Sequence, residues 1–104
     1  MTPEQSAMVE FLRGCFASGI EQARESGNML ITHGAPTLGI PLEVAEKRAR
    51  EQLHAAETRL QFFEETVVPY LGTAGPTGRI AEQQLQLLAW EHLGDPDYRD
   101  DWKP

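Results

Sequence analysis

The sequence predicts an all-α protein, a three-helix antiparallel bundle with a long central helix and a docked C-terminal tail, as a single domain over residues 1–104. Three long stretches carry apolar residues at three- and four-residue steps, which is the spacing of amphipathic helices. Clusters of proline and glycine separate these stretches and predict turns between the helices. A chain of about 100 residues holds one hydrophobic core, and this favours one domain over two.

The first helix is predicted over residues 3–26. Thr2 can cap its N-terminus, Pro3 suits the first helical position, and the Gln5 side chain can close a capping box with Thr2. An apolar stripe follows, made of Ala7, Met8, Phe11, Leu12, Cys15, Phe16, Ile20 and Ala23. The run Ser26-Gly27-Asn28 is expected to stop the helix.

Residues 28–41 contain two prolines and two glycines, which disfavour a long regular element. The apolar run from Met29 to Thr32 could form a buried loop, a last helical turn or a brief strand. No other segment offers an obvious strand to pair with it, so we expect a loop packed on the core.

The second helix is predicted over residues 41–68, and a helix of this length extends about 40 Å. Its apolar residues follow a heptad-like repeat, which Leu42, Ala49, Ala56 and Phe63 continue in one row and Leu53, Leu60 and Val67 in another. Either shorter helices cover this stripe, or part of it contacts another chain. The candidate partner-binding residues of the stripe are Leu53, Leu60, Phe63 and Val67, and a homodimer along residues 42–67 is one form of this contact.

The third helix is predicted over residues 78–93, capped by Thr77 and ended by Gly94. Its apolar residues cover more than half of the circumference, so we expect the helix to be buried on two sides. The tail, residues 95–104, is polar and acidic but carries Tyr98 and Trp102. Disordered tails seldom contain tryptophan, so we expect these two aromatic residues to dock on the protein's own helices or on a partner.

The formal net charge is −7, and the acidic excess is spread along the chain. Such a charge repels phosphate backbones and disfavours binding to nucleic acid. The one basic cluster, Lys47, Arg48 and Arg50, is interleaved with glutamates. Residues 38–50 nevertheless resemble the turn and second helix of a helix-turn-helix unit, so a nucleic-acid-binding regulator that uses these three residues is the alternative function.

Residues that could carry chemistry are few. Cys15 lies within the apolar stripe of the first helix, where we expect a packed, inert thiol with a raised pKa. His33, His54 and His92 lack the spacing of a metal site. Glu51 and His54 match one half of a di-iron motif, which needs a second half that only a symmetric dimer could supply. We therefore expect no catalytic residue, no metal, no cofactor and no enzymatic activity.

No stretch approaches 18 consecutive apolar residues, so no membrane-spanning helix is predicted. The first residues lack the basic segment and apolar run of a signal peptide. A single cysteine cannot form a disulfide within the chain. We accordingly expect a cytoplasmic protein.

The C-terminal segment resembles a known signature. Leu87-Leu88-Ala89, followed by the run from Asp95-Pro96-Asp97-Tyr98 to Trp102-Lys103-Pro104, is similar to the ending of a family of short uncharacterised actinobacterial and actinophage proteins. Phe11-Leu12-Arg13 and residues 44–48 occur in the same order along the chain as similar segments of that family. The resemblance implies an accessory or host-interaction role and brings no activity or catalytic residue with it.

These observations together predict a small acidic helical protein that binds another protein or regulates it. The partner would be a host protein or a second copy of the chain, and the resemblance suggests an accessory protein of a phage or mobile element. The contact would use the heptad stripe of the second helix or the tail residues Tyr98 and Trp102.

Overall fold

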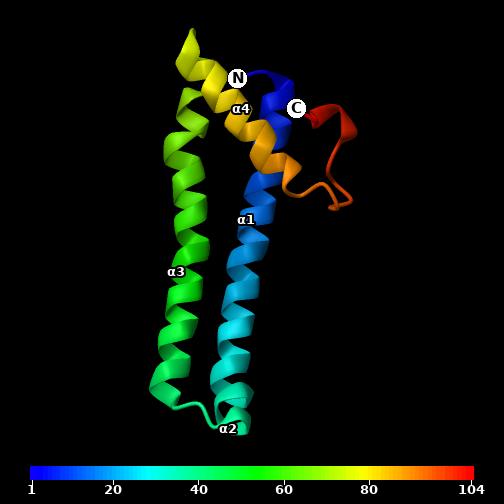
Figure 1. Cartoon of the computed structure of the whole chain (residues 1–104). Coiled ribbons are helices and arrows are strands. Elements are labelled where there is room, and N and C mark those ends of the chain that lie inside the picture. The colour runs from blue at the N-terminus through cyan, green and yellow to red at the C-terminus, as the bar shows by residue number, and fades with distance from the viewer. The chain divides into compact units, whose positions relative to one another are not determined.

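The computed structural model describes all residues 1–104, and every regular element in it is helical (Figure 1). The α-helices are α1 (Pro3–Met29), α2 (Ala35–Leu38), α3 (Leu42–Thr66) and α4 (Pro76–Trp90). A π-helical turn covers Leu30–Gly34, and 3₁₀ turns cover Val68–Tyr70 and Asp100–Trp102. The all-α prediction is therefore confirmed. None of the helices combines the length and the apolar character needed to cross a membrane.

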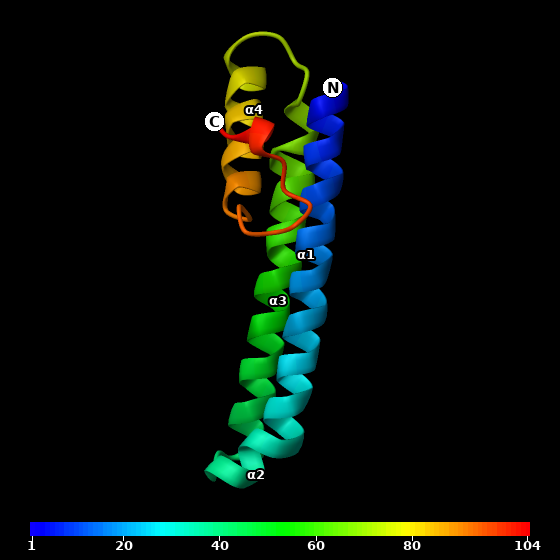
Figure 2. The same ribbon diagram turned by 90° about the vertical axis from the view of Figure 1, so that its right-hand side faces the viewer.

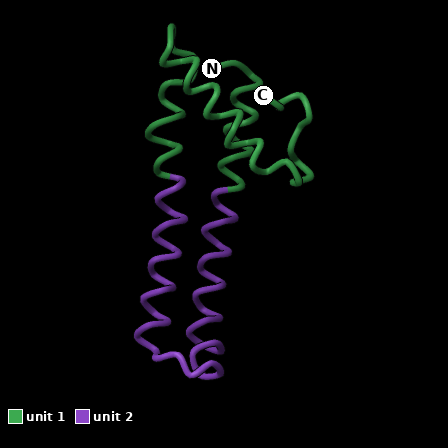
Figure 3. The backbone as a smooth tube through the Cα atoms, viewed as in Figure 1, with its two compact units in different colours: residues 1–15, 61–104 green, residues 16–60 purple.

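The chain divides into two compact units (Figure 3). Unit 1 contains residues 1–15 and 61–104, and unit 2 contains residues 16–60. Unit 1 thus holds the first turns of α1, the end of α3, α4 and the tail. Unit 2 holds the rest of α1, the π-helical turn, α2 and most of α3.

The start of α1 follows the prediction. The Thr2 hydroxyl accepts a hydrogen bond from the Gln5 backbone N–H at 3.1 Å, and the Gln5 side chain accepts one from the Thr2 N–H at 3.0 Å. This reciprocal pair is a capping box, which satisfies two backbone donors that the first helical turn leaves unpaired.

The predicted end of this helix at residues 26–28 is wrong, since α1 continues to Met29. Gly27 is buried, and a Cβ atom placed on it would lie only 2.9 Å from the Cβ of Ala49 on α3. Gly27 therefore allows close approach of two helices instead of ending one. A glycine inside a helix carries the same sequence signal as one at its end.

The loop expected over residues 28–41 is also wrong for most of its length. The backbone passes from α1 into the π-helical turn and on into α2 without leaving the helical region. Pro36 lies in the first turn of α2, and Gly39 ends that helix in the left-handed conformation with φ 69°. Here Pro36 lies at the start of a short helix and Gly39 ends it, so proline and glycine do not produce a loop.

In unit 2, the C-terminal part of α1 and the N-terminal part of α3 lie side by side (Figures 1 and 2). The buried residues of this unit are all small, namely Gly27, Ala35, Ala45 and Ala56. Small side chains bring helix backbones close together but bury little apolar area each.

The ends of the other helices shift by a few residues from those predicted. α3 begins directly after Pro41 and ends at Thr66, and Pro69 lies in the 3₁₀ turn that follows. α4 begins at Pro76, with Gly75 as its cap, so the expected start at residue 78 with Thr77 as cap is wrong. Proline at the first helical position sets the start, because its fixed φ suits a helix.

Unit 1 contains all of the largest fully buried side chains. These are Phe63, Met8, Leu12, Leu85, Val9 and Val67. They come from α1, from the segment around the end of α3, and from α4. The 3₁₀ turn of the tail contacts α4, as Figure 2 shows, and the Trp102 side chain is only 2% exposed.

Candidate functional site

The sequence-predicted partner-binding residues of the heptad stripe lie largely inside the chain. Phe63 and Val67 are fully buried in unit 1, where they form part of its core. Leu53 and Leu60 are half-buried in unit 2. In this conformation Phe63 and Val67 offer no surface to a partner, because the chain itself covers them.

The two aromatic residues of the tail join a cluster with α1 and the turn after α4. The ring of Phe11 lies 5.3 Å from that of Trp102, 6.1 Å from that of Tyr98 and 6.2 Å from that of His92, measured between centroids. Tyr98 and Trp102 meet edge to face at 5.7 Å. The Arg99 guanidinium lies 5.7 Å over the Trp102 ring, within range of a cation–π interaction.

Two polar atoms of this aromatic cluster are buried without a hydrogen-bond partner, the Tyr98 Oη and the Trp102 Nε1. Burial raises the pKa of the Tyr98 phenol, and the nearby carboxylates of Asp100 and Asp101 raise it further. The Tyr98 hydroxyl therefore stays protonated at neutral pH.

Cys15 lies in unit 1 with its side chain half-buried. Burial raises the pKa of the thiol, and the negative charges of Asp95 and Asp97 act in the same direction. Since the thiolate is the nucleophilic form, the expectation of a poorly reactive cysteine agrees with this environment.

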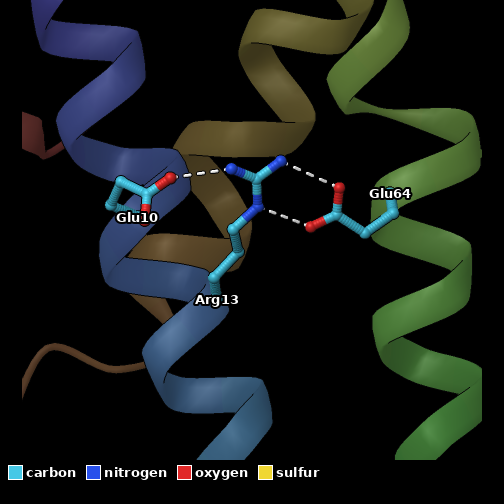
Figure 4. Close-up of polar contacts among 3 residues, drawn as sticks. All are labelled: Glu10, Arg13 and Glu64. Carbon is cyan, nitrogen blue, oxygen red and sulfur yellow. Dashed lines mark hydrogen bonds and ion pairs between the residues drawn. The ribbon is translucent and has the colours of Figure 1, made fainter.

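A charged cluster links α1 to α3 within unit 1 (Figure 4). The Arg13 Nε and Nη2 donate to the two carboxylate oxygens of Glu64 at 2.6 and 2.9 Å, and Nη1 donates to Glu10 at 2.7 Å. These bonds lower the pKa of Glu64 and raise that of Arg13. The two-point geometry fixes the relative orientation of both side chains, so the cluster has a structural role.

An apolar surface of unit 1 lies on the exposed side of α4. Ile80, Leu87 and Trp90 are 54%, 47% and 46% exposed, and Gln83 is exposed on the same side. Their spacing places them along one face of the helix, opposite the buried Ala81, Leu85 and Ala89. We call Ile80, Gln83, Leu87 and Trp90 the α4 face. The prediction that this helix is buried on two sides is wrong.

The apolar surface continues from the α4 face toward the end of α3. A shallow groove of about 240 Å³ borders Ile80 and is lined by Thr66, Tyr70, Thr77, Ala81 and Gln84. Tyr70 is half-exposed, and Phe62, one turn before Thr66, is 55% exposed. Exposed apolar side chains that gather in this way are typical of a contact surface.

The basic residues proposed for the alternative function lie on α3 in unit 2. Lys47 is exposed and pairs with Glu51 at 3.7 Å, while Arg48 and Arg50 are exposed. Arg50 borders a groove of about 410 Å³ together with Glu46 and the close contact of Gly27 and Ala49. The groove thus carries charges of both signs.

No group of three or more histidine, cysteine, aspartate or glutamate side chains is arranged to hold a metal ion. His54 is exposed on α3, and its backbone carbonyl accepts a hydrogen bond from the Thr58 hydroxyl at 2.7 Å.

The candidate site is the α4 face, on the evidence of its exposed apolar residues. The sequence shows these residues as a surplus on the third helix, but that surplus predicts burial. Comparison with protein-family models, curated proteins and solved structures finds no match to the chain.

Proposed function

We propose that this protein acts by binding another protein and that the α4 face is its contact surface. The observation that carries the proposal is the exposure of Ile80, Leu87 and Trp90 along one side of a helix whose other side is packed in unit 1. Tryptophan is among the residues that most often supply much of the binding free energy in protein interfaces.

The α4 face is better supported as the contact surface than the heptad stripe or the tail. A partner that bound Phe63, Val67 or Trp102 would first have to displace them from unit 1, at the cost of their burial. A homodimer along residues 42–67 meets the same obstacle at Phe63 and Val67. The α4 face needs no such rearrangement.

The proposed setting is that of a small regulatory or accessory protein in the cytoplasm, acting on a host protein. The resemblance of the C-terminal segment to a family found in actinobacteria and their phages supports this setting. We also propose that unit 1 is an antiparallel helix bundle with a docked tail. The Arg13–Glu64 bonds and the Phe11–Trp102 ring contact support that arrangement.

Site-specific photo-crosslinking tests the proposed function. A photoreactive amino acid replaces Leu87 on the α4 face or, in a matched control, Leu38 of α2, which is 70% exposed in unit 2. We expect cross-linked partners in living cells from position 87 and not from position 38. Equal cross-linking from both positions, or none from position 87, would contradict the proposal.

The alternative of a nucleic-acid-binding regulator receives weaker support. Lys47 is already paired with Glu51, and Arg50 borders a groove that also contains Glu46. Fluorescence anisotropy with duplex DNA at low salt distinguishes the two functions. Binding that is lost on Arg48→Gln and kept on Leu87→Gln would favour the alternative.

A further inference from the structure

The charge of the protein is concentrated in the unit that carries the α4 face. Unit 1 contains ten carboxylate and four basic side chains, a formal net charge of −6. Unit 2 contains six carboxylate and five basic side chains, a net charge of −1. Along the sequence the acidic excess looks evenly spread. In the fold, unit 1 brings together the acidic residues of both ends of the chain, and this concentrates the negative charge.

Much of the positive charge in unit 1 is already engaged. Arg13 bonds Glu10 and Glu64, Lys103 pairs with Asp100 at 3.7 Å, and Arg99 lies over the Trp102 ring. The fourth basic residue, Arg79, is exposed at the start of α4 next to Ile80. Carboxylates that form no ion pair remain near both ends of the apolar surface. Glu65 follows Phe62 by three residues on α3, and Glu91 follows Leu87 by four, so each lies close to an exposed apolar side chain.

The shape of the α4 face suits another helix. Ile80, Leu87 and Trp90 form a single row, and the residues from 80 to 90 extend about 15 Å along the helix axis. That length matches about three turns of a partner helix whose own apolar stripe lies against the row. The side-chain amide of Gln83 can form hydrogen bonds with the backbone or with polar side chains of the partner.

A second copy of the chain fits this surface poorly. An interface between two α4 faces would bring together two copies of unit 1, each with a net charge of −6. At physiological salt, like charges still repel each other over about 8 Å. A partner of opposite charge gains from the same field.

We propose that the α4 face binds a basic amphipathic helix of a partner protein, with apolar residues against Ile80, Leu87 and Trp90 and lysine or arginine residues toward nearby carboxylates such as Glu91. This inference rests on the proposed function and specifies the chemistry of the partner. It also accounts for an apolar surface on a strongly acidic unit, because charge complementarity raises the rate of association and favours one orientation of the partner.

The test uses two fluorescent helical peptides of about 14 residues with the same leucine stripe, one with lysine and the other with glutamate at the remaining positions. Anisotropy titrations with the full chain measure each affinity. We expect the lysine peptide to bind at least about tenfold more tightly than the glutamate peptide. Its affinity should fall as the salt concentration is raised.

Variants locate the binding surface. Leu87→Gln should lower the affinity for the lysine peptide by about tenfold, and Glu91→Gln should lower it by a smaller factor. The control Leu38→Gln should leave this affinity unchanged. Circular dichroism checks that each variant keeps the helix content of the parent. Because Leu87, Glu91 and Leu38 are all exposed, we expect all three variants to fold.

Three results would overturn the inference. The two peptides could bind equally, Leu38→Gln could weaken binding as much as Leu87→Gln, or sedimentation could show a dimer that Leu87→Gln dissociates. If position 87 still cross-links a partner in cells while the lysine peptide fails to bind, the basic helix is wrong and the proposed function stands. If position 87 cross-links nothing, the proposed function itself fails.

Discussion

At the scale of single residues, Gly27 sets the approach of α1 and α3 within unit 2. Its missing side chain leaves room for Ala49, so the two backbones can come closer than larger residues would allow. Gly19, two turns earlier on the same helix, has open space where a Cβ atom would stand. The two glycines therefore predict opposite effects of the same substitution.

Gly27→Ala should lower the free energy of unfolding by about 1 kcal/mol, because the overpacking cost exceeds the gain in helix propensity. Gly19→Ala should raise it by about 0.5–1 kcal/mol, because nothing opposes that gain. Urea denaturation followed by circular dichroism measures both. Equal stabilisation by the two substitutions would mean that Gly27 is not a close contact.

Trp102 tests the aromatic cluster of unit 1. Trp102→Ala should lower the free energy of unfolding by about 3–5 kcal/mol, the usual cost of deleting a buried aromatic side chain. Trp102→Phe should cost only about 1–2 kcal/mol, since it keeps a ring against Phe11 and removes a buried N–H that has no partner. Equal costs of the two substitutions in guanidinium denaturation would contradict this account, because a phenyl ring would then keep none of the packing of Trp102.

At the scale of the helix, sequence periodicity predicted the existence of the three long helices but not all of their ends. The Thr2–Gln5 box and Pro41 gave correct starts because each acts through its own backbone geometry. Residues 26–41 were misinterpreted because a glycine that permits close packing and one that ends a helix look alike in sequence. Only the position of Ala49 tells them apart.

The candidate site was also only partly predictable. The sequence contains the surplus of apolar residues on the third helix, yet it does not say which of them face unit 1 and which face outward. The exposed positions Ile80, Leu87 and Trp90 are distinguished by the packing of Leu85 and Ala89 on the opposite side. Likewise, the acidic character of unit 1 arises when segments distant in sequence join.

The Arg13–Glu64 pair joins two helices and gives a pH-dependent prediction. Hydrogen bonds from Arg13 lower the pKa of Glu64 in the folded chain. A carboxyl group whose pKa is lower in the folded chain than in the unfolded chain stabilises the fold at pH values above its unfolded pKa. This contribution is lost as the pH falls through the pKa of the folded chain. Both side chains are about a third exposed or more, so solvent screening limits the contribution to about 0.5–1 kcal/mol.

Glu64→Gln should therefore be less stable than the parent at pH 7 by this amount, and the difference should vanish as the pH falls well below 4.5, the ordinary value for glutamate. Urea denaturation across this pH range measures the difference. Glu65→Gln is the matched control, because the Glu65 carboxylate accepts a bond from the uncharged Gln61. A constant difference at all pH values would show that Glu64 acts through packing instead of charge.

At the scale of the whole molecule, the two units differ in what they bury. Every one of the largest fully buried side chains belongs to unit 1, whereas the buried positions of unit 2 are glycine and alanine. Apolar burial contributes to stability roughly in proportion to its area, so unit 2 gains less from its interior.

Hydrogen exchange followed by mass spectrometry should register this difference. We expect backbone amides in residues 20–27 and 45–56 to exchange at least about tenfold faster than those in residues 5–13 and 81–89, because local opening of unit 2 costs less free energy. Peptides from each unit serve as references for the other. Uniform protection along all the helices would indicate that the whole chain opens as one cooperative unit.

The discontinuous sequence of unit 1 has a kinetic consequence. Its two segments are separated by the 45 residues of unit 2, and the loss of chain entropy on closing a loop grows with the number of residues that it contains. If residues 16–60 form their helical hairpin early, that hairpin shortens the flexible loop before the distant segments meet. Substitutions that weaken the hairpin would then slow refolding of the aromatic cluster, although they lie far from it in sequence.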